Sequence, residues 1–329
     1  MYENEQKLMT RIAVLFYEKG YTQEEIGELL HMSRLQVHRR LRTAVEEGHI
    51  KIQVQSKYRE NILMEEQLHR LFPTQEIIVT ESDPDTEKNK LYIARAGAEL
   101  LIERLENCSY LGVSWGSTAS LVSECLPKHS FKGLKVGNIV GGVSDLGDAG
   151  AQQVAMKIAM KLDAELRVWS LPFMMETAET RNMVLRDHYI KKDIEALRAC
   201  DACLLGIGNK GSEFSHMVQQ NFDSVGKVPL KSSAVGEIAG RYFDIDGNLA
   251  EENTKADRRV GLTLEDFKNM KCSIGVAGGA EKRDAIIGAL KGGYLTCLVT
   301  DIETAQNIVQ YETSRHKKAE RPDLPAVNR

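Results

Sequence analysis

The chain of 329 residues lacks several features that mark membrane and secreted proteins. It contains no run of about 18 apolar residues, the length that a membrane-spanning helix requires. Its first residues, MYENEQKLMTR, lack the apolar stretch of a signal peptide. Its six cysteines are scattered along the chain, so we expect reduced thiols rather than a disulfide framework. These absences predict a soluble, cytoplasmic protein with no membrane partner.

Motifs for metal binding and hydrolysis are also missing. The eight histidines include no H-E-x-x-H pattern, and the C-x-x-C spacing of Cys200 and Cys203 has no second Cys or His pair at zinc-site distance. A helix end that runs into a strand accounts better for these cysteines. Asp244 and Asp246 resemble half of a calcium loop without its final glutamate, and a hairpin turn at Gly247 explains them better. We therefore expect no metal, no cofactor and no catalytic residues.

The net charge of −4 hides an uneven distribution. Residues 1–59 carry 10 Lys and Arg against 8 Asp and Glu, whereas residues 60–329 carry 33 against 39. Four arginines lie close together with no acid among them: Arg34, Arg39, Arg40 and Arg42. A local cationic stripe on an acidic protein indicates one localised contact with a polyanion.

The first 48 residues have the pattern of three short helices. Thr22 with Glu25, and Ser33 with Gln36, form two capping-box patterns separated by a short turn, as a helix-turn-helix requires. The apolar spacing predicts that two helices face inward through these residues: Ile26, Leu29, Leu30, Val37, Leu41 and Val45. Alternating apolar residues at 49–54 then predict a short wing strand.

The outward face of the third helix suits DNA. Arginine can bond guanine twice in the major groove, and Leu35 can contact a thymine methyl. The helix start at Thr22 and Gln23 suits phosphates. The predicted DNA-binding residues are Thr22, Gln23, Ser33, Arg34, Leu35, Gln36, Arg39, Arg40 and Arg42. The alternative is a helical protein–protein module with a solvated basic face, but the caps, the turn, the apolar register and the acid-free arginines together favour DNA.

The rest of the chain predicts a larger α/β domain. Residues 56–72 indicate a charged helix with Ile62, Leu68 and Leu71 inward, which ends at Pro73. Short apolar runs then alternate with amphipathic stretches, the pattern of a parallel sheet covered on both faces. The expected strands are 76–79, 110–113, 134–139, 166–171, 202–207, 272–276 and 295–299, and the expected helices are 88–105, 118–126, 150–163, 189–199 and 282–290.

These elements divide the chain into four predicted parts. Residues 1–55 form a winged helix-turn-helix, 56–73 a helical linker, 74–313 an effector-binding domain and 314–329 a flexible tail. The predicted fold class is therefore α/β, with an N-terminal winged helix-turn-helix and a doubly wound, mostly parallel-sheet effector domain.

Ligands of such sheets bind beyond the carboxyl ends of the strands, where this sequence has glycine-rich loops. In GVSWGSTAS, residues 112–120, Gly116 permits close approach, and Ser117 and Thr118 open a helix that suits a phosphate. No lysine follows as in a nucleotide-hydrolysing P-loop, and a tight strand-to-helix corner is the alternative interpretation. Lys282 lies at the start of another such helix, where an anionic ligand would offset its unfavourable position; the alternative is a solvated surface lysine.

Four segments resemble the SorC/DeoR-type family of sugar-responsive bacterial regulators. They are MSRLQVHRRLRTAVEEGHIKI, GVSWGSTAS, VGEIAGRYFDIDGN and GVAGGAEKRDAIIGALKGGYLTCLVTD, and they span nearly the whole chain in the expected order. The resemblance implies a winged helix-turn-helix joined to a domain similar to sugar-phosphate isomerases and deaminases. It also implies dimers or tetramers that release or reposition on operator DNA when a phosphosugar binds.

Applied to this sequence, the resemblance implies a set of effector contacts. Gly116, Ser117 and Thr118 hold the phosphate with help from Lys282, Gly141, Gly142 and Gln152 line the opposite wall, and Glu237 accepts hydrogen bonds from ligand hydroxyls. Glycine-rich loops at the ends of two further predicted strands add four residues, Gly206, Gly208, Ala277 and Gly278. The predicted effector-binding residues are Gly116, Ser117, Thr118, Gly141, Gly142, Gln152, Gly206, Gly208, Glu237, Ala277, Gly278 and Lys282.

Two functions fit this sequence. The first is a DNA-binding regulator of a carbohydrate-catabolism operon, controlled by a small phosphorylated sugar or polyol. The alternative is a sugar-phosphate isomerase or deaminase with a DNA-binding appendage, which needs a carboxylate base and usually a poised histidine. Glu237 could be the base, but the glycine loops hold no histidine. A regulator would be a homodimer or homotetramer, because one recognition helix reads only a few base pairs.

Overall fold

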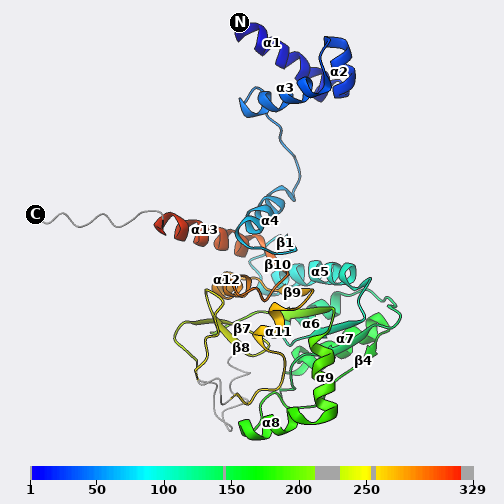
Figure 1. Ribbon diagram of the computed structural model, residues 1–329, viewed down its shortest axis with the longest axis vertical. Coiled ribbons are helices and arrows are strands. Elements are labelled where there is room, and N and C mark those ends of the chain that lie inside the picture. Colours follow the sequence, from blue (N-terminus) through cyan, green and yellow to red (C-terminus); the bar gives the residue numbers. More distant parts are fainter. Residues whose placement is uncertain (1, 144–145, 212–229, 253–256, 320–329) are drawn as a thin grey trace, which may run out of the picture. The chain divides into compact units, whose positions relative to one another are not determined.

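The computed structural model describes residues 2–143, 146–211, 230–252 and 257–319 (Figure 1). The chain divides into two compact units, Met1–Arg59 and Glu60–Arg329, and each is described by itself. None of the described helices is long and apolar enough to cross a membrane.

The small unit consists of helices around a compact apolar core. Its elements are α1 (Tyr2–Ala13), the π-helical turn η1 (Val14–Glu18), α2 (Gln23–Leu30) and α3 (Arg34–Glu46). Ile12, Ile26, Val37 and Leu41 form the buried core. The helical pattern read from the sequence is therefore confirmed for this unit.

Two predicted core positions of the small unit are wrong. Leu29 and Val45 are 51% and 39% exposed, and Ala44 is buried instead. With about 3.6 residues per helical turn, a small bundle buries only one narrow stripe of each helix. On α3 that stripe contains Val37, Leu41 and Ala44, so the neighbouring Val45 turns toward solvent.

The predicted wing strand at 49–54 is also absent from the structure. Residues 51–56 belong to no helix or strand, and Ile52 and Val54 are exposed. Ile50 alone packs against the core, with its N–H donating to the carbonyl of Ala44 at 3.0 Å. Alternating apolar residues form a strand only beside a partner strand, and the described part of this unit offers none.

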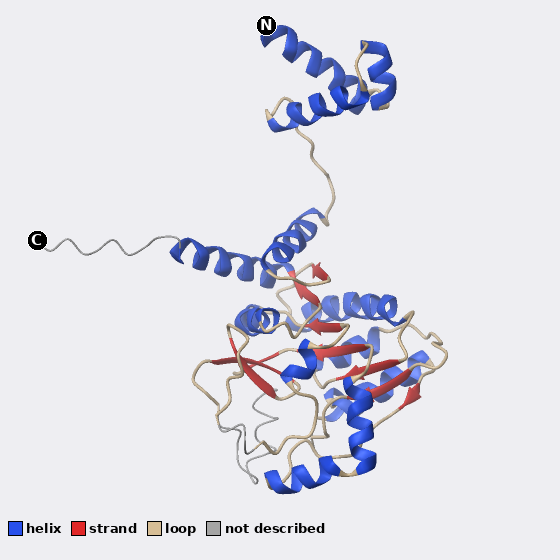
Figure 2. Ribbon diagram, viewed as in Figure 1, coloured by secondary structure: helices blue, strands red, loops and turns tan. Residues whose placement is uncertain are grey.

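The larger unit is built on a parallel sheet of seven strands in the order β1-β10-β9-β5-β2-β3-β4 (Figure 2). The prediction of a doubly wound, mostly parallel sheet is confirmed. The strands are β1 (Glu76–Thr80), β2 (Tyr110–Val113), β3 (Lys135–Asn138), β4 (Glu165–Leu166), β5 (Ala202–Gly206), β9 (Ser273–Val276) and β10 (Cys297–Asp301).

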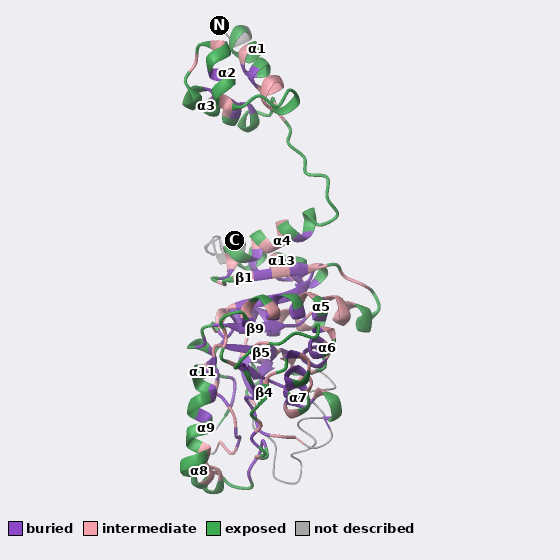
Figure 3. Ribbon diagram, turned by 90° about the vertical axis from the view of Figure 1, so that its right-hand side faces the viewer, coloured by how far each residue is buried: buried purple, intermediate pink, exposed green. Residues whose placement is uncertain are grey.

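Helices cover both faces of this sheet, and each face has its own apolar core. On one face, α5, α6 and α7 contribute Leu101, Val122 and Val154. On the other, α4 and α12 contribute Leu68 and Ile286. Figure 3 shows the buried strands between exposed outer helix surfaces. The helices are α4 (Arg59–Leu71), α5 (Thr86–Leu105), α6 (Ser117–Cys125), α7 (Ala151–Leu162), α8 (Ala178–Arg186), α9 (His188–Arg198), α11 (Leu264–Lys268), α12 (Arg283–Lys291) and α13 (Ile302–Ala319), with short 3-10 turns η2 (Gly147–Ala149) and η4 (Ala280–Lys282).

A small antiparallel sheet lies beside the main one and was not predicted. It contains β6 (Gly208–Asn209), β7 (Ala234–Ile238) and β8 (Arg241–Asp244). After β8 the chain reverses at Gly247, whose φ of +79° and hydrogen bond to the Asp244 carbonyl at 2.9 Å confirm the predicted turn.

Two predicted boundaries and one predicted core position in the larger unit differ from the structure. The strand expected at 166–171 ends at Leu166, because the side chain of Asn138 replaces the next ladder bonds by pairing with the main chain of Trp169. The tail expected from 314 begins inside α13, which runs to Ala319. Ile62, expected to face inward, is exposed on α4, where the buried Asn61 instead donates to the Val79 carbonyl at 2.8 Å.

The two cysteines of the C-x-x-C spacing lie in the core. Cys200 follows α9, and Cys203 lies in β5, so the predicted helix-to-strand junction is confirmed. Their Sγ atoms are 3.3 Å apart, and both contact the sulfur of Met270. Within the described residues, no three His, Cys, Asp or Glu side chains are grouped so that they could hold a metal ion.

Candidate effector pocket and DNA-binding helix

Both predicted capping boxes of the small unit are present. The Thr22 hydroxyl accepts from the Glu25 N–H at 3.2 Å, and the Glu25 carboxylate accepts from the Thr22 N–H at 2.7 Å. Ser33 and Gln36 exchange the same two bonds at 3.2 and 2.8 Å. These bonds fix where α2 and α3 begin, so they set the angle between the two helices.

A tight turn joins α2 to α3. His31 takes the left-handed conformation with φ of +54°, and the Met32 N–H donates to the Gly27 carbonyl at 2.8 Å. A Cβ at position 27 would lie 2.6 Å from the Met32 carbonyl oxygen, so this turn requires glycine. Two capped helices and this turn form a helix-turn-helix.

The arginines of α3 differ in their surroundings. Arg34 pairs with Glu24 at 3.2 Å, Arg40 with Glu5 at 3.3 Å and Arg42 with Glu46 at 2.7 Å. The fourth, Arg39, is exposed and has no ion-pair partner among the described residues. Leu35 is 57% exposed on the same helix. Arg39 and Leu35 are therefore available to a partner without breaking an internal ion pair.

The larger unit has a cavity at the point where its chain changes direction across the sheet. β2 and β5 pair in the middle of the sheet, with Val113 beside Leu204. After β2 the strands β3 and β4 extend to one edge, whereas β5, β9 and β10 extend to the other. A cavity of about 320 Å³ lies where the connections after β2 and β5 separate. Such switch points are where open α/β sheets bind ligands.

Seven predicted effector-binding residues line this one cavity. They come from the turn before α6 and its first residues, from the end of β5, and from β6, β7 and η4: Gly116, Ser117, Thr118, Gly206, Gly208, Glu237 and Lys282. The β2 and β5 loops pack closely, since a Cβ at Gly206 would lie 2.9 Å from the Trp115 carbonyl oxygen. The Ser114 hydroxyl accepts from the Gly206 N–H at 3.2 Å and holds the two loops together.

One wall of the cavity is arranged for an anion. α6 begins at Ser117, and no side chain caps its first turn. Negative charge is favoured at this helix start, because the first N–H groups of a helix have no intrahelical acceptor. Lys282 lines the same cavity, and its ammonium has no hydrogen-bond or ion-pair partner among the described residues. Burial and the charge of Lys90 lower the pKa of Lys282, while Glu281 and Glu237 oppose that shift.

The cavity also contains a buried carboxyl group. Glu237 is 5% exposed on β7, and its Oε2 accepts from the Gly240 N–H at 2.7 Å. Its Oε1 occupies space that a Cβ at Gly208 would need. Burial raises the pKa of Glu237 to about 7, although the Gly240 N–H, Lys282 and the Trp115 indole lower it. That indole N–H is buried and faces the carboxyl without forming a hydrogen bond of normal geometry.

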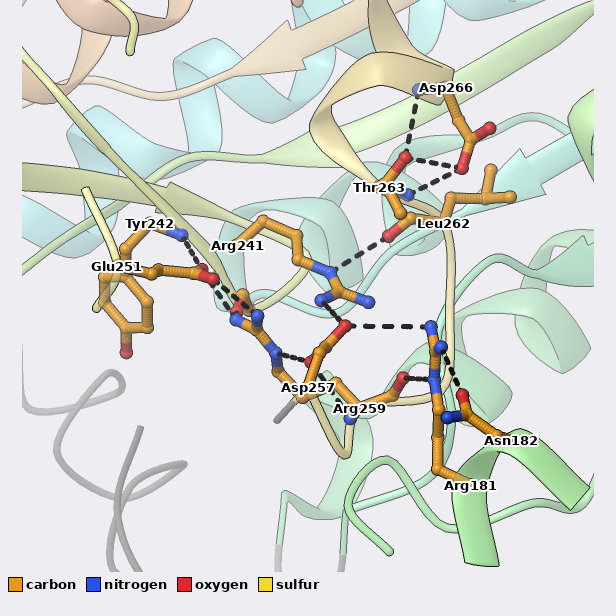
Figure 4. Close-up of polar contacts among 11 residues, drawn as sticks. Arg181, Asn182, Arg241, Tyr242, Glu251, Asp257, Arg259, Leu262, Thr263 and Asp266 are labelled. Carbon is orange, nitrogen blue, oxygen red and sulfur yellow. Dashed lines mark hydrogen bonds and ion pairs between the residues drawn. The ribbon is translucent and has the colours of Figure 1, made fainter. Parts of the chain in front are cut away.

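A buried charge network holds the turn that binds Glu237 (Figure 4). The Gly240 carbonyl accepts from Arg259 Nη1 at 2.8 Å, and Arg259 forms a two-bond pair with Glu251 at 2.6 and 2.5 Å. Asp257 accepts from both Arg259 and Arg241 at 2.7 Å. Burial raises the pKa of Asp257, but the two arginines outweigh it and hold the value at about 2.

The same network reaches α8. Arg181 donates from Nε to the Arg259 carbonyl at 3.1 Å, and its Nη2 lies 3.6 Å from Asp257 Oδ2. The β7–β8 turn, the segment after residue 256 and α8 are therefore tied together by charged groups (Figure 4). This network was not predicted from the sequence, because Arg241, Glu251, Asp257 and Arg259 follow no helical or strand spacing and Arg181 comes from a distant helix.

Comparison with known proteins identifies the family. Residues 56–310 match the model of a family described as "Putative sugar-binding domain". The chain is 30% identical to the deoxyribonucleoside regulator of Bacillus subtilis over 312 residues, which cover 94% of this chain and 99% of that protein. It is 29% identical to the sorbitol operon regulator of Klebsiella pneumoniae, with 92% and 98% covered. The chain belongs to the SorC/DeoR-type family of sugar-binding transcriptional regulators.

The fold of the family agrees with this assignment. The crystal structure of the full-length sorbitol operon regulator SorC from Klebsiella pneumoniae superposes with a TM-score of 0.70 at 27% identity, covering 93% of this chain and 99% of that one. The resemblance found in the sequence to SorC/DeoR-type regulators is thus confirmed.

Five of the predicted effector-binding residues are not among those that line this cavity. A Cβ at Gly141 would lie 2.7 Å from the Phe173 main chain, and the Gly142 N–H donates to the Leu171 carbonyl at 2.8 Å. Gln152 donates to the Trp169 carbonyl at 3.2 Å. Ala277 is fully buried, and Gly278 leaves room for the Asp301 carboxylate and Ile93. An effector contact of these five residues in this SorC/DeoR-type chain stays a prediction.

Other cavity residues were missed by sequence analysis. They are Thr86, Lys90, Trp115, Ile207, Val276 and Glu281. Thr86 and Lys90 lie on α5, which begins shortly after the carboxyl end of β1. The rule that located the other loops, that ligands bind beyond strand ends, applies equally to this connection, where we had expected the helix to begin only at residue 88.

Proposed function

We propose that this regulator binds operator DNA through α3 and that a small phosphorylated sugar or polyol in the cavity controls that binding. One observation carries the sensing half: the uncapped start of α6, the Lys282 ammonium, which none of the described residues pairs with, and the buried Glu237 meet in a single cavity. A helix N-terminus and a lysine suit a phosphate, and a buried carboxyl suits sugar hydroxyls. The cavity of about 320 Å³ suits a compact ligand.

The names of the relatives support the same class of effector. Two of them are named "Deoxyribonucleoside regulator" and "Sorbitol operon regulator". Sorbitol is a polyol, and a deoxyribonucleoside contains a sugar. We assign DNA binding to residues 1–55 and effector binding to residues 74–313. We further propose a cytoplasmic homodimer or homotetramer, because two half-sites give the specificity that one recognition helix lacks.

The runner-up, a sugar-phosphate isomerase or deaminase, has weaker support. Glu237 could act as a base, but none of the described lining residues of the cavity is a histidine. All the named relatives are regulators. We propose that the protein is not an enzyme. Conversion of a phosphosugar by the purified protein would contradict this.

A thermal-shift screen against phosphorylated sugars and polyols tests the sensing half. We expect at least one compound to raise the Tm of the full-length protein, because a ligand that binds only the folded state stabilises it. Lys282→Ala and Thr118→Val should abolish that rise. Lys192→Ala, which removes an exposed lysine of α9 outside the cavity, is the matched control.

The same compound should change the affinity for DNA. DNA selected from a random library by the wild-type protein serves as the target, with fluorescence anisotropy as the measurement. An unchanged Tm rise in Lys282→Ala would place the ligand elsewhere. A Tm rise without any change in DNA affinity would separate ligand binding from regulation.

A further inference from the structure

The effector cavity contains a second lysine, which the family resemblance did not suggest. Lys90 of α5 lines the cavity together with Thr86, on the side contributed by α5. Its side chain is 27% exposed, so it is neither a free surface group nor a core group.

The two lysines line the same cavity. Burial and the charge of Lys90 lower the pKa of Lys282, whereas Glu281, whose effect is larger than that of Lys90, and Glu237 raise it. Two ammonium groups at one cavity repel each other, and an anion placed between them offsets that repulsion. Glu281 and Glu237 offset part of this repulsion at Lys282, but among the described residues none forms an ion pair with its ammonium.

The helix ends around the cavity differ in what they offer an anion. The first turn of α5 is already capped, because the Asp85 carboxylate accepts from the N–H groups of Glu87 and Lys88 at 3.0 and 3.4 Å. The first turn of α6 has no side-chain cap. α5 therefore contributes the Lys90 side chain rather than its N-terminus, whereas α6 contributes N–H groups.

We propose that Lys90, Lys282 and the N-terminus of α6 together hold one doubly charged anionic group of the effector, with the chemistry of a phosphate dianion. This rests on the proposed function, since it names a contact and a charge state for the same site. Two lysines and a helix N-terminus match two negative charges better than one.

The chain carries an internal competitor for this anion. Glu87, one helical turn before Lys90, pairs with it at 2.8 Å and is 74% exposed. Exposed ion pairs on helices are weak, so a phosphate inside the cavity can displace Glu87 from Lys90. Glu87 therefore lowers the affinity of the site for anions, and its removal raises that affinity.

Binding of inorganic phosphate at pH 8, where phosphate is mostly a dianion, tests the proposal in the full-length protein. The dissociation constant is taken from the dependence of Tm on phosphate concentration. We expect Lys90→Gln to weaken binding about tenfold and Lys90→Arg to retain most of it. Glu87→Gln should strengthen binding about threefold. Lys88→Gln, which removes a lysine of the same helix that does not line the cavity, should change nothing.

The possible outcomes separate this proposal from the function on which it rests. If Lys282→Gln weakens phosphate binding but Lys90→Gln behaves like Lys88→Gln, the role of Lys90 is overturned and the proposed sensor site stands. If Glu87→Gln weakens binding, Glu87 supports the site instead of competing, which contradicts the proposal. If phosphate and phosphorylated compounds leave the Tm of the wild-type protein unchanged, both the role of Lys90 and the proposed sensor site are overturned.

Discussion

Glu237 and Gly240 are joined by a hydrogen bond of 2.7 Å from the main-chain N–H to the buried carboxylate. The turn between them contains two left-handed residues, Ala239 at φ +50° and Gly240 at +72°. Ala239 is buried, so the strain of this conformation is held by its surroundings, among them the bond from Arg259 to the Gly240 carbonyl. The position of the carboxyl is therefore set by the turn and the network behind it.

The raised pKa of Glu237 predicts a pH-dependent stability. Its pKa is about 7 in the folded protein, against a usual 4.5. Between these values the folded state binds more protons than the unfolded state, so the free energy of unfolding falls as the pH rises through that window. Glu237→Gln should remove this fall and stabilise the protein at pH 8 by about 2–3 kcal/mol. Urea unfolding at pH 5 and pH 8 measures the effect. Glu281→Gln, an exposed neighbour, is the control, and an unaltered pH dependence in Glu237→Gln would contradict the prediction.

Arg39 predicts sequence-specific DNA binding. It is the arginine of α3 without an ion-pair partner among the described residues, so it can reach a base edge without first leaving a glutamate. Arg39→Ala should weaken binding to the selected DNA by about 1–3 kcal/mol and leave effector binding intact. Arg11→Ala removes an exposed arginine of α1 and is the matched control. An equal loss on random DNA in the anisotropy measurement would show that Arg39 contacts phosphates.

Gly27 predicts a local weakness in the helix-turn-helix. Alanine normally stabilises a helix relative to glycine, but here its Cβ would meet the Met32 carbonyl at 2.6 Å. Gly27→Ala should destabilise α2 and α3 by about 1–3 kcal/mol, with weaker DNA binding as a consequence. Hydrogen exchange of the full-length protein should show faster exchange in residues 23–46 and unchanged exchange in the main sheet. Glu28→Ala, at an exposed position of the same helix, should not have this effect. Slower exchange in Gly27→Ala would mean that the turn can shift at little cost.

The buried Arg259–Glu251 pair should make the protein sensitive even to Arg259→Lys, a substitution that keeps the positive charge but lowers the free energy of unfolding. Both side chains are buried, and the guanidinium makes two bonds to the carboxylate. Lysine cannot form both bonds, so Arg259→Lys should destabilise the protein by about 2 kcal/mol or more. Arg198→Lys changes a guanidinium that is 52% exposed and bonds Asp266 through Nε at 3.0 Å, so it should cost less than about 1 kcal/mol. Denaturant unfolding compares the two variants, and equal costs would show that the buried network is not rigid.

Local patterns allowed much of the fold to be predicted. The capping boxes at Thr22 and Ser33 placed α2 and α3, because a cap depends on residues only three positions apart. The buried strands such as β2 were found because a strand covered on both faces is apolar throughout. The wing strand failed for the opposite reason: alternating residues at 49–54 lack a partner strand in the described part of the small unit.

The effector site was only partly predictable from local patterns. Gly116, Ser117 and Thr118 could be predicted from the sequence, since a glycine at a tight turn and a helix start are local features. Lys90 did not, because its place at the cavity depends on how α5 crosses the sheet. Gln152 and Gly141 were assigned through the family resemblance. In the structure the Gln152 side chain donates to the Trp169 carbonyl, and Gly141 lies against the main chain of Phe173.

The sequence by itself determined the starts of α2 and α3, the arginine-bearing helix, most strands of the parallel sheet and the family. Each depends on residues that are neighbours in the chain or on a helix face. Only the tertiary structure decided which loops share the cavity, that Glu237 is buried beside Lys282, and that the arginine network holds the turn at Gly240. Burial and charge pairing depend on distances in space, and those distances are set when strands far apart in the sequence pair within one sheet.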